Sequence, residues 1–300
     1  MTTYSSCAMI DTEFTQHLAQ LRDQVEARLD VLLPPAGNER DLVAAAMREG
    51  ALAPGKRLRP ILLMLAAEGL GAASRPALEL GCAVEMVHAA SLVLDDMPCM
   101  DDARQRRGRI TVHLAFGEDV AILAAVALLS RAFALVATIE GILPAVRNQL
   151  VEVLANAIGT QGLVCGQLQD LRDGQRPRSA QEIAATNDLK TGVLFGALMD
   201  MACLLTDAPR SIRGMLQHFA SELGQAFQLY DDLQDRDPAS AKDQGKDAGK
   251  STFVALCGEA EVRRRLKAHL DCAEQWLIQA YERETPIAGF LRLIFAKALV

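Results

Sequence analysis

Two acidic clusters, each directly after an apolar segment, are the part of this sequence best suited to chemistry. The first spans residues 95–102 (DDMPCMDD) and the second residues 231–235 (DDLQD). Carboxylates beside apolar walls repel one another and lose hydration, unless cations neutralise them. Oxygen ligands without His or Cys suit Mg²⁺, which usually also binds a substrate phosphate. The clusters therefore indicate a magnesium site that faces a phosphorylated substrate, although two solvated helix ends would be the simpler alternative.

Helical geometry decides which carboxylates of each cluster share a face. At about 100° per residue, Asp231 and Asp235 lie about 40° apart, with Asp232 about 100° from Asp231. An unbroken helix would separate Asp95 from Asp101 by about 240°, but a proline at position 98 cannot be accommodated without loss of a backbone hydrogen bond. We therefore expect a kink or bulge that brings Asp101 back towards Asp95.

Basic residues supply the opposite charge. The segment 55–60 (GKRLRP) opens an apolar helix, and a helix N-terminus with Lys and Arg beside it is an anion site. Further arginines at positions 104, 106, 107 and 109 follow the first acidic cluster. Aspartates interleaved with arginines indicate a diphosphate pocket, and a solvated charged loop is the alternative for the arginine run.

Two further motifs imitate known sites. The segment 245–252 (GKDAGKST) is one residue short of a P-loop and follows polar residues instead of a strand, so we expect Lys246 to contact substrate phosphates in another way. Glu85 and His88 have the E-x-x-H spacing of di-iron bundles, but no other histidine has Glu three residues before it. His88 lies two helical turns before Asp95 and could reach a diphosphate, or could be a satisfied core histidine.

The elements that must position these residues are helices. Half of the residues are apolar and only 4% are aromatic, which favours helix over sheet. Turn-forming segments divide the chain into roughly ten stretches of helical length, and no linker or repeat interrupts it. We predict an all-α bundle, a single domain over residues 1–300 with residues 1–10 flexible. Residues 120–139 are long enough to span a membrane, but the charge of Arg131 favours a central helix buried on all sides.

Charge and cysteine content narrow the partners and the compartment. A net charge of −7 with a pI near 5.3 argues against a nucleic acid as binding partner. The seven cysteines form no C-x-x-C pair and indicate reduced thiols. The N-terminal residues have no signal-peptide pattern, so we expect a cytoplasmic protein without a membrane span.

Taken together, the motifs resemble the trans-isoprenyl diphosphate synthases, and most closely the bacterial geranylgeranyl diphosphate synthases of carotenoid pathways. The resemblance covers about residues 40–255, where GKRLRP, DDMPCMDD followed by RRG, KTG, GQAFQLYDDLQD and GKDAGKST occur in the family's order. The chain departs from the family at Ile110, where Pro is common, and at Ala125-Val126, where Gly-Asp is common. The resemblance implies an all-α fold around a deep central cavity, usually in a homodimer.

The resemblance also implies roles for particular residues. Two or three Mg²⁺ ions would be held by Asp95, Asp101, Asp231 and Asp235, with Asp96, Asp232 and Lys190 completing the catalytic set. The allylic diphosphate would be bound by Arg106, Lys190, Thr191, Gln228 and Lys246. Isopentenyl diphosphate would be bound by Lys56, Arg59, His88 and Arg107, with Arg57 as an additional candidate.

The implied reaction joins isopentenyl diphosphate head to tail to dimethylallyl, geranyl or farnesyl diphosphate by ionisation, condensation and proton elimination. Ala90 and Ser91 lie about one helical turn before Asp95, where they would form the floor that limits product length. Because Ala90 is small, we expect geranylgeranyl diphosphate as the product. A farnesyl diphosphate synthase, a head-to-head synthase or terpene cyclase, and a non-catalytic regulatory subunit remain alternatives.

Overall fold

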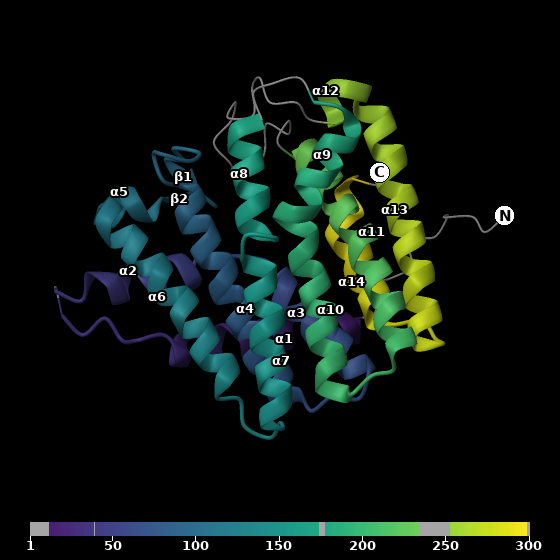
Figure 1. Cartoon of the computed structure of the whole chain (residues 1–300), viewed down its shortest axis with the longest axis horizontal. Coiled ribbons are helices and arrows are strands. Elements are labelled where there is room, and N and C mark those ends of the chain that lie inside the picture. The colour runs from purple at the N-terminus through teal and green to yellow at the C-terminus, as the bar shows by residue number, and fades with distance from the viewer. Residues whose placement is uncertain (1–11, 39, 174–177, 235–252, 299–300) are drawn as a thin grey trace.

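Helices make up almost all of this computed structural model, which describes residues 12–38, 40–173, 178–234 and 253–298 (Figure 1). Within these ranges the only strands are β1 (Gln105–Arg106) and β2 (Arg109–Ile110), a short antiparallel pair. The predicted all-α class is confirmed. The predicted flexibility of residues 1–10 concerns a segment outside the described residues.

The helices differ widely in length. In chain order they are α1 (Thr12–Leu32), α2 (Leu42–Ala51), α3 (Leu58–Gly69), α4 (Ser74–Asp95), α5 (Val112–Phe116), α6 (Glu118–Ala137), α7 (Pro144–Ile158), α8 (Leu163–Asp173), α9 (Ala180–Asn187), the π-helix η1 (Asp188–Gly192), α10 (Val193–Thr206), α11 (Arg210–Gln234), α12 (Phe253–Cys257), α13 (Glu259–Tyr281), α14 (Pro286–Phe295) and the 3₁₀-helix η2 (Ala296–Ala298).

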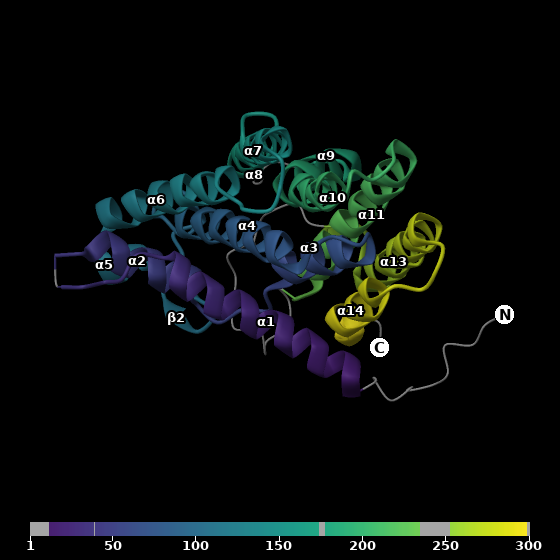
Figure 2. The ribbon, with the colours of Figure 1, turned by 90° about the horizontal axis from the view of Figure 1, so that it is seen from below.

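Helix α4 lies in the middle of the bundle, between α3 and α6, while α1 crosses beneath it (Figure 2). Leu80, Val84 and Met86 are fully buried in the shared core. Burying a side chain of this size stabilises the fold by about 1.5–3 kcal/mol. The helix that ends at the first acidic cluster is therefore held rigidly along its length.

Helix α11, which leads to the second acidic cluster, packs against α10 and α13. On one face of α11, Phe219, Leu223 and Tyr230 are buried in the core and Phe227 packs against it. The Tyr281 hydroxyl donates to the Ala66 carbonyl at 3.1 Å and so ties the end of α13 to α3. The two acidic helix ends are thus connected through one core.

The expectation that residues 120–139 form a helix buried on all sides is wrong. Small side chains such as Ala121 and Ala124 face the core from α6, whereas Ile122, Leu123 and Val126 are 46%, 54% and 58% exposed. Burial follows the 3.6-residue period even though the helix is apolar all round. By length and composition three helices of the described chain could cross a membrane, and that property alone is not evidence of a span.

The π-helix η1 was not predicted, and close backbone packing surrounds it. A Cβ atom added to Gly166 of α8 would lie 2.4 Å from the backbone nitrogen of Lys190. A Cβ atom on Gly224 of α11 would lie 2.8 Å from the Cα of Gly192. Only glycine allows α8 and α11 to approach η1 this closely, and these contacts fix the backbone that carries Lys190 and Thr191. Single π-helical turns inside α-helices frequently mark functional sites.

Candidate functional site

In the first acidic cluster the chain turns so that Asp101 returns towards Asp95, as we expected from the proline at position 98. Helix α4 ends at Asp95, and the backbone nitrogen of Asp101 donates to the Asp95 carbonyl at 2.9 Å. Burial raises the pKa of Asp95 from 3.8 to about 6; the charges of Asp101 and Asp96 raise it further, while Lys190 and Arg106 lower it. Asp95 therefore lies between acidic and basic neighbours at the end of a buried helix.

Two of the predicted residues, Asp96 and Arg106, bind each other. The Arg106 Nε donates to Asp96 Oδ1 at 2.9 Å. Burial raises the pKa of Asp96, and the hydrogen bond from Arg106 counteracts this. The pKa of Arg106 is raised in turn, because the Asp96 hydrogen bond and the charges of Asp96 and Asp95 outweigh its burial. The pair holds the β1–β2 hairpin against the end of α4.

Lys190 has a partner that the sequence interpretation missed. Its Nζ donates to Asp170 Oδ2 on α8 at 2.7 Å, and Asp170 also lies 3.8 Å from Arg178. Burial lowers the pKa of Lys190, but Asp170, Asp95 and Asp101 together raise it above its ordinary value. Lys190 is therefore a cation shared by three carboxylates. No local signal predicts the contact, because it joins residues twenty positions apart.

A group of basic residues that includes Arg59 and His88 lies where α3 begins. Arg59 Nη1 lies 3.3 Å from His88 Nε2, and the Arg59 guanidinium lies over the rings of Phe195 and Phe227, 5.4 and 5.9 Å from their centroids. Burial, followed by the charges of Arg59, Arg107 and Arg106, lowers the pKa of His88 well below its ordinary range. His88 is therefore neutral near pH 7, and its Nε2 accepts from Arg59.

The other basic residues predicted to bind isopentenyl diphosphate face different surroundings. Lys56 is exposed, with its Nζ 5.6 Å from the centroid of the Tyr230 ring. Arg107 donates from Nη1 to the Pro54 carbonyl at 3.1 Å. Arg57 is buried, and its Nη1 donates to Glu85 Oε1 at 2.8 Å. The structure thus brings Lys56, Arg59 and Arg107 to one region, whereas Arg57 is bound within the protein.

The second acidic cluster is described as far as position 234. Burial lowers the pKa of Arg59, and the charge of Asp231 is one of those that oppose this lowering, so Asp231 lies near Arg59. Asp232 is buried and accepts from the Phe253 backbone nitrogen at 2.9 Å and from Gln228 Nε2 at 3.2 Å. The predicted residues Asp235 and Lys246 lie outside the described residues. Among the described residues, no three His, Cys, Asp or Glu side chains are grouped closely enough to hold a metal ion.

The predicted floor residues lie on α4, one turn before the acidic cluster. Ala90 is fully buried. Ser91 is partly buried, and its hydroxyl donates to the His88 carbonyl at 2.8 Å. A larger side chain at position 90 would have to displace the core atoms around it.

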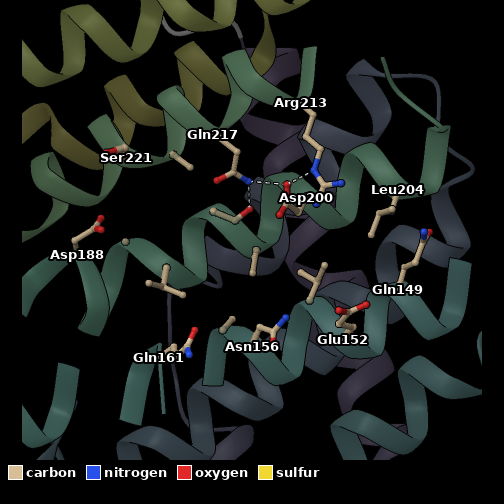
Figure 3. A pocket seen from close by; sticks show the side chains of 17 residues that line it. Gln149, Glu152, Asn156, Gln161, Asp188, Asp200, Leu204, Arg213, Gln217 and Ser221 are labelled. Carbon is tan, nitrogen blue, oxygen red and sulfur yellow. Dashed lines mark hydrogen bonds and ion pairs between the residues drawn. The ribbon is translucent and has the colours of Figure 1, made fainter. Parts of the chain in front are cut away.

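A hollow of about 680 Å³ lies elsewhere, between α7, α10 and α11 (Figure 3). Its polar lining includes Glu152, Asp188 and Asp200, and Asp200 accepts hydrogen bonds from Arg213 and Gln217, both at 2.7 Å. None of the residues predicted for the site lines it. The hollow thus borders the π-helix η1 at Asp188 and Gly192 without including the predicted site residues.

Fold and site together define a class: an all-α enzyme in which acidic helix ends face arginine and lysine side chains. Comparison with known proteins is consistent with this class. The family described as polyprenyl synthetase matches residues 40–272. The geranylgeranyl diphosphate synthase of Pantoea ananas is 52% identical, with 98% of each chain covered, and that of Pseudescherichia vulneris is 48% identical, covering 93% of this chain and 91% of the relative.

A solved structure agrees in fold. The crystal structure of an FPP/GFPP synthase from Zymomonas mobilis superposes with a TM-score of 0.83 at 33% identity, covering 94% of this chain and 98% of that chain. The chain belongs to the polyprenyl synthetase family. It is therefore an enzyme of prenyl transfer, and the resemblance seen in the motifs is confirmed.

Proposed function

We propose that this chain is a Mg²⁺-dependent geranylgeranyl diphosphate synthase that joins isopentenyl diphosphate head to tail to allylic diphosphates. The observation that carries the proposal is the meeting of opposite charges at the end of α4, where Lys190 and Arg106 act on the Asp95 carboxylate. Interleaved carboxylates and cations suit a metal-bound diphosphate. The names of the two relatives that are 52% and 48% identical support the same product.

The residues present fit Mg²⁺ by the type of their ligand atoms, and not by a preformed cluster among the described residues. Asp95 at the end of α4, Asp101 in the turn that follows it and Asp231 on α11 would hold the ion, and all three offer only oxygen ligands. Burial raises the pKa of Asp95 to about 6, which means that its carboxylate lacks sufficient compensating charge. A divalent cation supplies that charge. When bound, Mg²⁺ neutralises the negative charge that develops on the departing diphosphate.

The side chains of the chain itself bind and orient the two substrates. Lys190 and Arg106 would bind the allylic diphosphate beside Asp95, and their charges favour breaking of the allylic C–O bond. Lys56, Arg59 and Arg107 would bind isopentenyl diphosphate, with neutral His88 donating from Nδ1. The double bond of isopentenyl diphosphate then attacks the allylic cation, and a proton leaves to the released diphosphate. The rings of Phe195 and Phe227, which pack against Arg59, would help to exclude water from the bound substrates.

Ala90 sets the proposed product length. An isoprene unit is similar in length to one helical turn of about 5.4 Å, so the side chain one turn before Asp95 limits how far the product extends along α4. Ala90 carries only a methyl group at this position, which favours a longer product than a bulky side chain would. We therefore assign a twenty-carbon product instead of the fifteen-carbon farnesyl diphosphate.

Product analysis tests the proposal. The purified chain is incubated with isopentenyl diphosphate and, in turn, dimethylallyl, geranyl and farnesyl diphosphate, with Mg²⁺ or with EDTA, and the dephosphorylated products are separated by chromatography. Geranylgeraniol that forms only with Mg²⁺ is the expected result. Farnesol as the end product would indicate a farnesyl diphosphate synthase, diphosphate release without isopentenyl diphosphate a cyclase, and turnover only after addition of a second protein a regulatory subunit.

We also propose a homodimer, formed through the exposed apolar face of α6. Ile122, Leu123 and Val126 are each about half exposed on consecutive turns, and contiguous exposed apolar surface usually marks an interface. Leu123→Glu should convert the dimer to a monomer in light scattering coupled to size exclusion. A wild-type chain that elutes as a monomer at micromolar concentration would refute the dimer.

A further inference from the structure

Arg57 lies in the basic segment GKRLRP but is bound within the protein. Its side chain is only 2% exposed. Its Nη1 donates to Glu85 Oε1 at 2.8 Å and to the Ala51 carbonyl at 3.0 Å, and its Nη2 donates to the Ala53 carbonyl at 2.9 Å. These bonds use the guanidinium on the protein side. Arg57 is therefore not arranged as a ligand for a substrate that enters from solvent.

The backbone conformation of Arg57 explains how its side chain is buried while that of the preceding Lys56 is exposed. Arg57 is the N-cap of α3 and has φ +48° and ψ +38°, the left-handed conformation. This conformation is unfavourable for residues with a Cβ atom and persists only where surrounding contacts impose it. The bonds to Glu85 and to the two carbonyls supply such contacts. Lys56, directly before Arg57, remains exposed.

Glu85 is a buried carboxylate next to Arg57. It lies on α4 one turn before His88, and its side chain is 5% exposed. Burial lowers the pKa of both Arg59 and Arg107, and among the charges that act on them that of Glu85 is the strongest, opposing this lowering in each case. One buried carboxylate thus lies within reach of three arginines and is hydrogen-bonded to Arg57.

We propose that Arg57 is a positioning residue that neutralises Glu85 and so leaves Arg59 and Arg107 available for the diphosphate of isopentenyl diphosphate. The inference rests on the function proposed above. A buried carboxylate requires a cationic partner. If Arg57 is removed, Arg59 and Arg107 remain as cations on which the charge of Glu85 acts, and either would turn towards Glu85 and away from the substrate. Arg57 then supports substrate binding without touching the substrate.

A double-mutant cycle tests this role. Arg57→Met should raise the KM for isopentenyl diphosphate about 10-fold or more, because a charge-assisted contact to the substrate is lost. The KM for farnesyl diphosphate should stay within about 3-fold of wild type, because Lys190 and Arg106 are untouched. Arg57→Met combined with Glu85→Gln removes both charges and should return the KM for isopentenyl diphosphate to within about 3-fold of wild type.

The ion pair between Arg28 and Glu79 provides the matched control. Arg28 Nη2 lies 2.6 Å from Glu79 Oε1, which is also on α4 and buried. Neither residue is among the charges acting on Arg59 or Arg107. Arg28→Met and Arg28→Met with Glu79→Gln should change the melting temperature but leave the KM for isopentenyl diphosphate unaltered.

Each result separates the alternatives. A KM that stays about 10-fold raised in the double variant identifies Arg57 as a direct ligand and overturns the inference. An unchanged KM in soluble Arg57→Met shows a purely structural role and also overturns it. If Arg57→Met does not fold, the double variant alone still decides between ligand and positioning residue. A wild-type chain that neither binds nor consumes isopentenyl diphosphate overturns the proposed function itself, whereas an active wild type with an impaired double variant overturns only this inference.

Discussion

Replacing Asp95 by Asn should stabilise the metal-free protein at alkaline pH while abolishing turnover. Burial is the main reason that the pKa of Asp95 rises from 3.8 to about 6. At pH values between 3.8 and about 6, Asp95 is protonated in the folded chain but not in the unfolded chain. The free energy of unfolding therefore falls as the pH rises through this range to the folded pKa. At 1.36 kcal/mol per pH unit, the difference costs the wild type about 3 kcal/mol at pH 8 and about half of that at pH 5. Asn carries no charge and avoids this cost.

Thermal unfolding in EDTA measures the effect. For a chain of this size, 1 kcal/mol corresponds to roughly 2 °C, so Asp95→Asn should melt about 6 °C above wild type at pH 8 and about 3 °C above it at pH 5. Glu261→Gln is the control, because hydrogen bonds from Arg264 and Arg265 lower the pKa of Glu261 to about 2 and its neutralisation should not stabilise. Equal melting temperatures at pH 8, or the same gain at both pH values, would refute the reasoning.

Three substitutions test the remaining assignments. Ala90→Tyr should shift the product from twenty to fifteen carbons in chromatography, and an unchanged product would show that position 90 is not the floor. Gly166→Ala should lower kcat about 10-fold or more, because the new Cβ would meet the Lys190 backbone at 2.4 Å; Gly214→Ala, where the new Cβ meets nothing within 4 Å, should not. Asp231→Ala should lower turnover by orders of magnitude with an unaltered helical circular dichroism spectrum, and near-normal rates would remove it from the proposed metal site.

The helical class and the place of the acidic clusters followed from the sequence. Composition and 3.6-residue periodicity act locally, so they predict helices and identify the carboxylates at the end of α4. The return of Asp101 to Asp95 was also predictable, because proline at position 98 cannot continue the helix. The exposed face of α6 could not be predicted, because α6 is apolar on all sides and its sequence therefore does not distinguish the residues that face the core from those that face the surface.

Other features of the site depend on contacts that the sequence does not show. Spacing placed Arg57 beside Arg59, but the left-handed backbone at Arg57 directs it to Glu85, 28 positions away. The contact between Lys190 and Asp170 is similarly long-range. The π-helix η1 has no composition that distinguishes it from an α-helix, and close packing by Gly166 accompanies it. Two neighbouring carboxylates at the end of α4 also have different partners: Asp96 is hydrogen-bonded to Arg106, whereas Lys190 is the strongest charge acting on Asp95.

The most direct test of the central claim is anomalous diffraction from crystals grown with Mn²⁺ and a thiolo analogue of farnesyl diphosphate that cannot ionise. The account predicts manganese peaks between the end of α4, at Asp95 and Asp101, and the end of α11, at Asp231, each in contact with the diphosphate. A diphosphate bound elsewhere, or manganese absent from both helix ends, would contradict it.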